Sequence, residues 1–198
     1  MPRTHTLLVA FLAAALFIAM SPVAAFAQDP TYISNSQCKI CHNKKDEGEQ
    51  WNIWKAEKHS KAFELLSTDE AKAVATKAGL TTPPAESPEC LTCHVTSFDT
   101  ATGKAAEKIK MADGVQCESC HGPGSEHAAL GKKFKSGDKT VNPADKMPHP
   151  GESACVKCHN DKSPTWKTDR YTLADGTTVG FDYAQAWEKI KHNKPAKN

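Results

Sequence analysis

All eight cysteines of this 198-residue chain fall into four C-x-x-C-H motifs. The motifs start at Cys38, Cys90, Cys117 and Cys155. This pattern is typical of haem c attachment, because two thiols at this spacing reach both vinyl groups of one porphyrin and the next histidine lies under the iron. We therefore predict four covalently bound haems. Their thioether and proximal ligands are Cys38, Cys41, His42, Cys90, Cys93, His94, Cys117, Cys120, His121, Cys155, Cys158 and His159.

Paired cysteines have three other common uses besides haem attachment. An exported chain can use cysteines as a disulfide framework, and C-x-x-C pairs also bind zinc or act as redox dithiols. None of these uses explains a histidine directly after every pair. The irregular spacing of the motifs also argues against a solenoid of equal units.

The first 27 residues have the features of a secretory signal. A short polar start with Arg3 precedes the apolar run Leu7–Met20, and Ala25-Phe26-Ala27 matches a small-x-small cleavage site. We expect cleavage before Gln28, with an uncleaved membrane anchor as the competing interpretation. Residues 28–198 then form a single periplasmic domain with peripheral or no membrane contact, since no other segment is apolar enough to span a bilayer.

Charge and hydropathy limit the function classes. The formal net charge is only +2, which gives no support for nucleic-acid binding. The mean hydropathy of −0.55 is low, and the apolar runs are short. We expect the porphyrins to supply the missing apolar core, so that the chain does not fold without haem.

Four histidines remain as candidates for the second axial position of each iron. They are His59, His127, His149 and His192. Four candidates for four irons suggest bis-histidine ligation. Met111 and Met147 are alternative ligands, although packing roles are expected for both.

The four candidates differ in their local context. His59 lies on a predicted amphipathic helix, and His192 ends another one. His127 follows a Gly-Pro-Gly turn that reverses the chain after His121, so it is expected to reach a different haem. His149, between two prolines, is either the fourth distal ligand or a pocket residue near an iron left open.

The remaining patterns predict a mainly α-helical chain with much irregular structure. Hydrophobic periodicity and capping signals favour three helices. A polar loop and a small hairpin around Asp-Gly near the C-terminus are also expected. The predicted helices are Glu47–Leu66, Ser67–Gly79 and Asp182–Lys191, the linker is Thr81–Pro88, the loop is Lys132–Pro150, and the hairpin is Tyr171–Val179.

Several of these residues together resemble the tetrahaem cytochrome c-554 family. They are Trp51-x-x-Trp-x-x-x-x-His59-x-x-Ala-Phe63, Cys93-His94-Val95 with Phe98, Cys117-Glu-Ser-Cys-His-Gly-Pro-Gly124, and the Trp166…Phe181-Asp-Tyr…His192 tail. The resemblance runs over nearly all of residues 32–192. It implies a compact, mainly helical multihaem fold and a periplasmic electron relay, in the family from hydroxylamine oxidoreductase towards the quinone pool.

The resemblance also implies a ligand set. His127 would ligate the iron of His42, His192 that of His121, and His59 that of His159. The family's second haem, here that of His94, lacks a protein ligand on its distal face and has been linked to nitric oxide binding. His149 is a departure that would close this site if it reached the His94 iron.

We expect an electron-transfer protein rather than an enzyme, working between donor and acceptor redox proteins as a monomer. One alternative is a haem enzyme that reduces a small nitrogen oxide at the His94 iron. Another is a subunit of a cytochrome filament or of a larger oxidoreductase complex.

Overall fold

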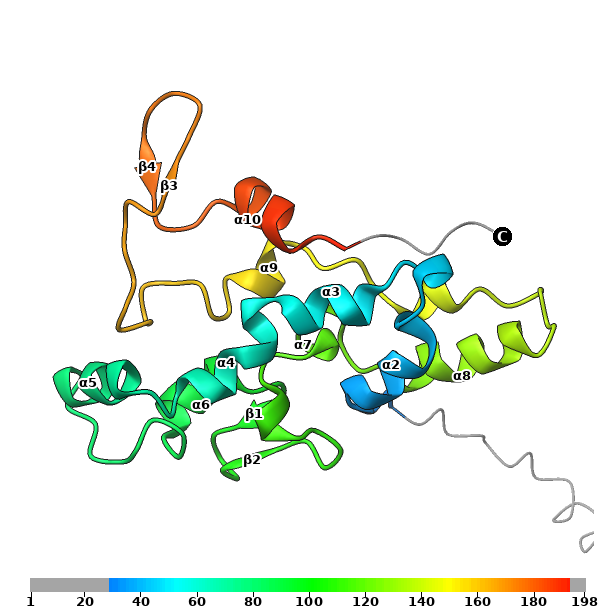
Figure 1. The fold of residues 1–198 in the computed structure, drawn as a ribbon, viewed down its shortest axis with the longest axis horizontal. Coiled ribbons are helices and arrows are strands. Elements are labelled where there is room, and N and C mark those ends of the chain that lie inside the picture. The colour runs from blue at the N-terminus through cyan, green and yellow to red at the C-terminus, as the bar shows by residue number, and fades with distance from the viewer. Residues whose placement is uncertain (1–28, 193–198) are drawn as a thin grey trace, which may run out of the picture.

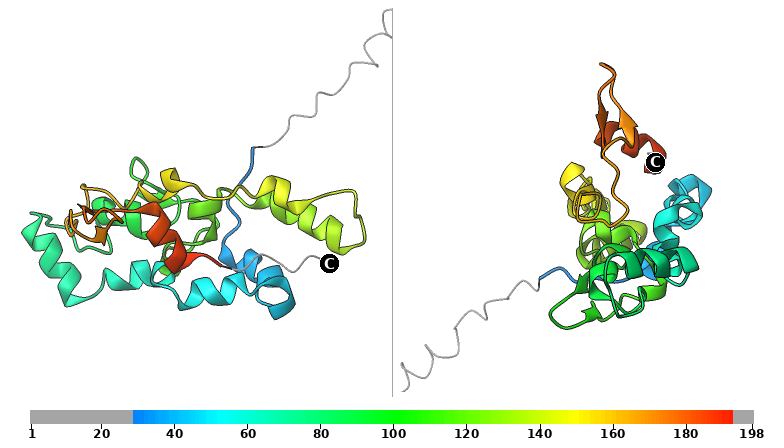
Figure 2. Two further views of the ribbon diagram at one scale, coloured as in Figure 1. Left: turned by 90° about the horizontal axis from the view of Figure 1, so that it is seen from above. Right: turned by 90° about the vertical axis from the view of Figure 1, so that its left-hand side faces the viewer.

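The computed structural model of the chain describes residues 29–192, so the predicted signal segment lies outside the described residues. Short helices and two small hairpins are joined by long irregular segments (Figure 1). The mainly helical character and the large share of irregular structure are as the sequence predicts. The molecule is elongated, with α5 at one end and α8 at the other (Figure 2). In chain order, the elements are α2 (Asn35–His42), η1 (Lys45–Glu47), α3 (Gln50–Ala56), η2 (Lys58–Lys61), α4 (Ala62–Leu65), α5 (Asp69–Lys77), α6 (Pro88–His94), β1 (Phe98–Asp99), β2 (Lys104–Ala105), η3 (Met111–Asp113), α7 (Cys117–His121), α8 (Ser125–Lys135), η4 (Pro143–Lys146), α9 (Glu152–Cys155), β3 (Tyr171–Thr172), β4 (Thr178–Val179) and α10 (Tyr183–Ile190).

The prediction of one helix over Glu47–Leu66 is wrong, because the segment is divided into α3, η2 and α4. The break is at Glu57, whose backbone is extended at ψ 162°. The Ser60 hydroxyl donates to the carbonyls of Lys55 and Glu57 at 3.0 and 2.8 Å. These bonds satisfy carbonyls at the end of α3, so the chain can turn without leaving them unpaired.

Two other helices follow their sequence signals closely. The Thr68 hydroxyl accepts a hydrogen bond from the Ala71 N–H at the start of α5, and the chain leaves this helix through Gly79 at φ 77°. At the start of α10, the Asp182 carboxylate accepts from the Gln185 N–H. The predicted loop 132–150 is partly wrong, because α8 extends into it and η4 forms inside it.

Both sheets are two-stranded antiparallel hairpins. The predicted one pairs Tyr171 with Val179 and projects from the body of the molecule as β3–β4 (Figure 1). The other pairs Phe98 with Ala105 and was not predicted, because its strands are only two residues long and the turn between them has no Asn-Gly or Asp-Gly pair.

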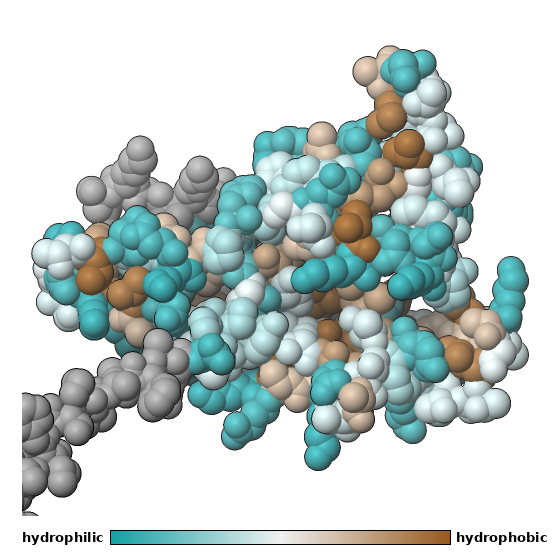
Figure 3. Space-filling view, turned by 180° about the vertical axis from the view of Figure 1, so that it is seen from behind, coloured by the Kyte–Doolittle hydropathy of each residue, from teal (hydrophilic) through white to brown (hydrophobic). Residues whose placement is uncertain are grey.

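The apolar core made by protein side chains is small. One buried cluster, around α4 and α6, consists of Leu66, Leu91, Val95 and Ile109. Apolar residues otherwise lie in scattered patches among polar ones on the face seen in Figure 3. Within residues 29–192, no helix is long and apolar enough to cross a membrane. A core this thin fits a fold that is completed by porphyrins.

Gly114 makes the tightest backbone contact near a candidate iron ligand, His59. Its backbone has φ 64° and ψ −137°, a conformation that essentially only glycine adopts. A Cβ at this position would lie 2.8 Å from the His59 carbonyl oxygen and 3.1 Å from the Ala62 nitrogen. The neighbouring Val115 N–H donates to the same His59 carbonyl at 3.0 Å. Gly114 therefore fixes the turn that carries His59.

We predict that Gly114→Ala lowers the free energy of unfolding by about 3 kcal/mol, from backbone strain plus the contact with segment 59–62. Urea unfolding of the haem-loaded protein measures this. Gly103→Ala is the matched control, since Gly103 has φ 67° and nothing within 4 Å of the added Cβ. Equal losses in the two variants would show that the contact with segment 59–62 contributes nothing.

Candidate haem sites

Each C-x-x-C-H motif places its two cysteines one helical turn apart. α2, α6 and α7 each end at the motif histidine. α9 ends at Cys155, and the N–H groups of Cys158 and His159 continue the turn by donating to the Cys155 carbonyl at 3.1 and 3.0 Å. Residues three apart in a helix share a face. Both thiols of a motif can therefore reach the same porphyrin.

Three pairs of imidazole rings face each other across gaps of nearly the same size. The ring centroids are 5.9 Å apart for His42 and His127, 6.0 Å for His59 and His159, and 5.8 Å for His121 and His192. Two imidazoles bound to opposite sides of one metal ion at about 2 Å have their centroids about 6 Å apart. Each pair contains one motif histidine, and these are the three pairs that the family resemblance implies.

Hydrogen bonds orient four of the candidate ligands through their Nδ1 atoms. The acceptors are three backbone carbonyls and one side-chain amide. A proton held on Nδ1 leaves the Nε2 lone pair free for a metal ion. The contacts are His94 with Ala62 O at 2.6 Å, His121 with Pro148 O at 2.9 Å, His127 with Pro143 O at 2.9 Å, and His42 with Gln50 Oε1 at 3.0 Å.

Burial keeps several of these imidazoles neutral. Desolvation is the main cause that lowers the pKa below the ordinary 6.5 for His42, His59, His121 and His159. Only the neutral imidazole has a lone pair to give to a metal ion. The protein therefore presents these ligands in the form that iron binds.

The cysteine sulfurs show how the four attachment sites are arranged. The thiols of Cys38 and Cys117, from the first and third motifs, lie close enough for each to shift the pKa of the other. Cys93 and Cys158 are paired in the same way between the second and fourth motifs, and the Cys158 thiol lowers the pKa of Cys93 to about 7. Cys120 lies within electrostatic range of Cys155. The sites thus form a continuous row in the order first, third, fourth, second.

The donor set fits haem c better than the other uses of cysteine pairs. None of the eight cysteines forms a disulfide. Among residues 29–192, no three His, Cys, Asp or Glu side chains gather as a metal-ion site, which zinc would need. Paired thiols on one helical face and imidazoles opposed at about 6 Å suit a porphyrin iron.

Comparison with known proteins agrees with this geometry. A family model described as cytochrome c554 and c-prime matches residues 37–122, and one described as cytochrome c3 matches residues 84–169. Cytochrome c-554 of Nitrosomonas europaea is 36% identical over 171 residues, which cover 78% of this chain and 68% of that protein. The chain belongs to the cytochrome c-554 family.

Two further matches support this assignment. The structure of reduced cytochrome c554 from Nitrosomonas europaea superposes with a TM-score of 0.50 at 26% identity, and covers 82% of this chain and 79% of that one. The multiheme cytochrome MtrA of Shewanella baltica is 30% identical over 95 residues, 43% of this chain and 27% of that protein. This member of the c-554 family is therefore a multihaem c-type cytochrome that binds haem c covalently and acts in electron transfer.

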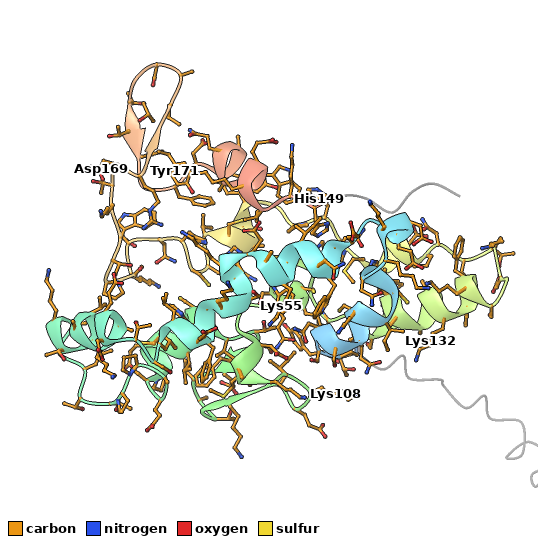
Figure 4. The ribbon with its side chains drawn as sticks, in the orientation of Figure 1. Lys55, Lys108, Lys132, His149, Asp169 and Tyr171 are labelled. Carbon is orange, nitrogen blue, oxygen red and sulfur yellow. The ribbon has the colours of Figure 1, made fainter. Side chains whose placement is uncertain are left out.

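His149 does not lie at the His94 iron site. Its ring packs against Trp187 of α10 with the centroids 4.7 Å apart. Figure 4 shows His149 beside α10, whereas α6, which ends at His94, lies beyond α3 and α4 in the same view (Figure 1). The carbonyls of Pro148 and Pro150 hold the loop there by accepting from His121 and Tyr183. Ligation of the His94 iron by His149 therefore has no support in this arrangement.

Two residues near the sites were given no role by the sequence reasoning. Phe181 stacks on His159 with the centroids 5.5 Å apart and the planes at 16°, and Tyr171 packs edge-on against Phe181. Glu118 is buried between the cysteines of the third motif. Phe181 belongs to the tail segment shared with the family, so the sequence contained an indication that this residue has a role at a haem site. Glu118 likewise belongs to the Cys117–Gly124 segment shared with the family, but nothing in the sequence indicates that its side chain is buried.

We predict that acid destabilises the folded holoprotein. Desolvation lowers the pKa of the four buried histidines below 6.5, and an iron bound to Nε2 would lower it further, so the unfolded chain binds more protons. The stabilisation is present above about pH 6.5 and is lost as the pH falls towards the folded-state values. Urea unfolding at a series of pH values between about 7.5 and 5 should give decreasing midpoints. Midpoints that rise on acidification would contradict this prediction.

Proposed function

We propose that this protein is a tetrahaem electron carrier in which three irons have two histidine ligands and the fourth has one. The observation that carries the proposal is the set of three imidazole pairs with centroids 5.8–6.0 Å apart, each containing a motif histidine. Each haem, when bound, supplies a one-electron change between ferric and ferrous iron.

The residues of the chain have three tasks in this proposal. The eight cysteines anchor the porphyrins as thioethers, and the motif histidines are the proximal ligands. His127, His59 and His192 are the distal ligands opposite His42, His159 and His121. Two strong imidazole donors stabilise ferric iron and block small molecules from that iron, which suits transfer without a bound substrate.

The cellular setting follows from the sequence features. We propose that residues 1–27 direct export and that the protein works in the periplasm between a donor and an acceptor redox protein. Signal-like features and four thioether motifs support export, because haem c attachment requires reduced thiols brought together with haem outside the cytoplasm. The continuous row of attachment sites supports a relay that joins two partners.

We predict that His59→Ala converts one haem from low-spin to high-spin while the haem content stays the same. The His59 and His159 planes are at 81°, whereas the other two pairs are at 20° and 36°. Perpendicular axial ligands leave the iron orbitals nearly degenerate and give a distinct, highly anisotropic low-spin signal. Electron paramagnetic resonance of the oxidised variant should lose that signal alone.

His149→Ala is the matched control, because it removes an exposed histidine that packs on Trp187. Its spectrum should equal that of the wild type. Loss of a low-spin haem in His149→Ala, or an unchanged spectrum in His59→Ala, would contradict the ligand assignment.

One observation favours a second candidate function at the His94 iron. Within residues 29–192, no other imidazole or aromatic ring contacts the ring of His94, whose Nδ1 lies 2.6 Å from the Ala62 carbonyl oxygen. An iron with one protein ligand can bind a small molecule on its other face. Binding and reduction of a small nitrogen oxide is therefore the alternative activity that we propose for this site.

Nitric oxide titration of the reduced protein, followed by visible absorption, tests the open site. We predict that one haem in four binds nitric oxide. Binding of none would contradict the open site, and binding by several haems would contradict the bis-histidine assignment of the others.

A further inference from the structure

Glu118 is a carboxylate buried inside the third haem-binding motif. It is only 2% exposed, although glutamate is among the residues least often buried. It takes no part in haem attachment or in iron ligation as proposed above. A buried charge is costly unless hydrogen bonds or an opposite charge compensate for the water that it loses.

Three backbone N–H groups surround the carboxylate. Ile33 donates to both oxygens at 2.9 and 3.2 Å, Ser34 donates to Oε2 at 2.8 Å, and Gly124 donates to Oε1 at 2.8 Å. All of these partners are donors, and an ionised carboxylate is a pure acceptor. The cage therefore suits the charged form. It also ties the segment before the first motif to the loop after the third.

The charge lies between two haem attachment sites. Glu118 directly follows Cys117 of the third motif, and it accepts from the N–H of Ser34, whose carbonyl accepts from the Cys38 thiol of the first motif at 3.7 Å. None of the ion pairs formed by residues 29–192 includes Glu118. N–H dipoles solvate the charge but do not neutralise it. Water that would screen it is excluded.

We propose that Glu118 is a positioning and tuning residue whose fixed negative charge lowers the reduction potentials of the first and third haems together. Oxidation leaves a positive charge on the iron porphyrin, and a nearby buried anion stabilises that state. This inference rests on the haem assignments proposed above. In addition to those assignments, one buried charge lowers the reduction potentials of two neighbouring haems and not those of the other two.

Glu118→Gln removes the charge and nearly keeps the shape of the side chain. We expect the equilibrium constant for reduction of the first and third haems to rise at least tenfold, a shift of about 59 mV for a one-electron couple. The second and fourth haems should change less than threefold. A redox titration followed by electron paramagnetic resonance measures this, and the 81° ligand angle makes the fourth haem separable.

Two control variants separate charge from structure. Glu89→Gln removes a fully exposed charge beside the second motif and should shift no haem, because water screens it. Glu118→Asp keeps the charge in a shorter side chain, so it should keep wild-type potentials at some cost in stability.

Unchanged potentials in Glu118→Gln, or an equal shift of all four haems, would overturn the proposal. Loss of the first or third haem from both Glu118 variants would show only a structural clamp and would also overturn it. If Glu118→Asp incorporates all four haems and Glu118→Gln does not, the first and third haems of Glu118→Asp must have wild-type potentials. Shifted potentials in that variant would overturn the proposal. Three low-spin haems in the wild-type spectrum show independently that the ligand assignments hold.

Discussion

The separation of about 6 Å between facing imidazoles is the constraint on which this structure depends. It brings together segments that are distant in the chain, such as α2 with α8 through His42 and His127, and α7 with the C-terminal end of α10 through His121 and His192. Few apolar contacts are available to do this, because the buried hydrophobic cluster lies around α4 and α6. We therefore propose that the haems, when bound, form the common core to which the short helices attach.

Polar contacts within the chain also hold the segments that carry the candidate iron ligands. Gly114 and Val115 fix the turn that carries His59, and the Ala62 carbonyl of the following helix orients His94. One short segment thus serves two iron sites. Glu118 has a comparable position between the first and third sites, where it closes a cage of N–H groups.

Much of the chemistry could be predicted from the sequence, because attachment of haem c needs a local motif that no other function explains. The distal ligands could be narrowed to four histidines by elimination, and the resemblance to the c-554 family supplied the pairing that the structure brings together. The predicted helix over 47–66 was wrong because the Ser60 hydroxyl satisfies the carbonyls of Lys55 and Glu57 where α3 ends, a local contact that hydrophobic periodicity does not reveal. His149 could not be placed from sequence, since its position depends on carbonyl contacts of the flanking prolines with His121 and Tyr183.

We propose that three of the irons have two histidine ligands each. Near-infrared magnetic circular dichroism of the oxidised holoprotein tests it most directly, because the energy of the ligand-to-iron charge-transfer band depends on the identity of both axial ligands. We expect bis-histidine bands that integrate to three low-spin haems in a protein with four. A band from histidine–methionine ligation, or bis-histidine intensity for fewer than three haems, would contradict it.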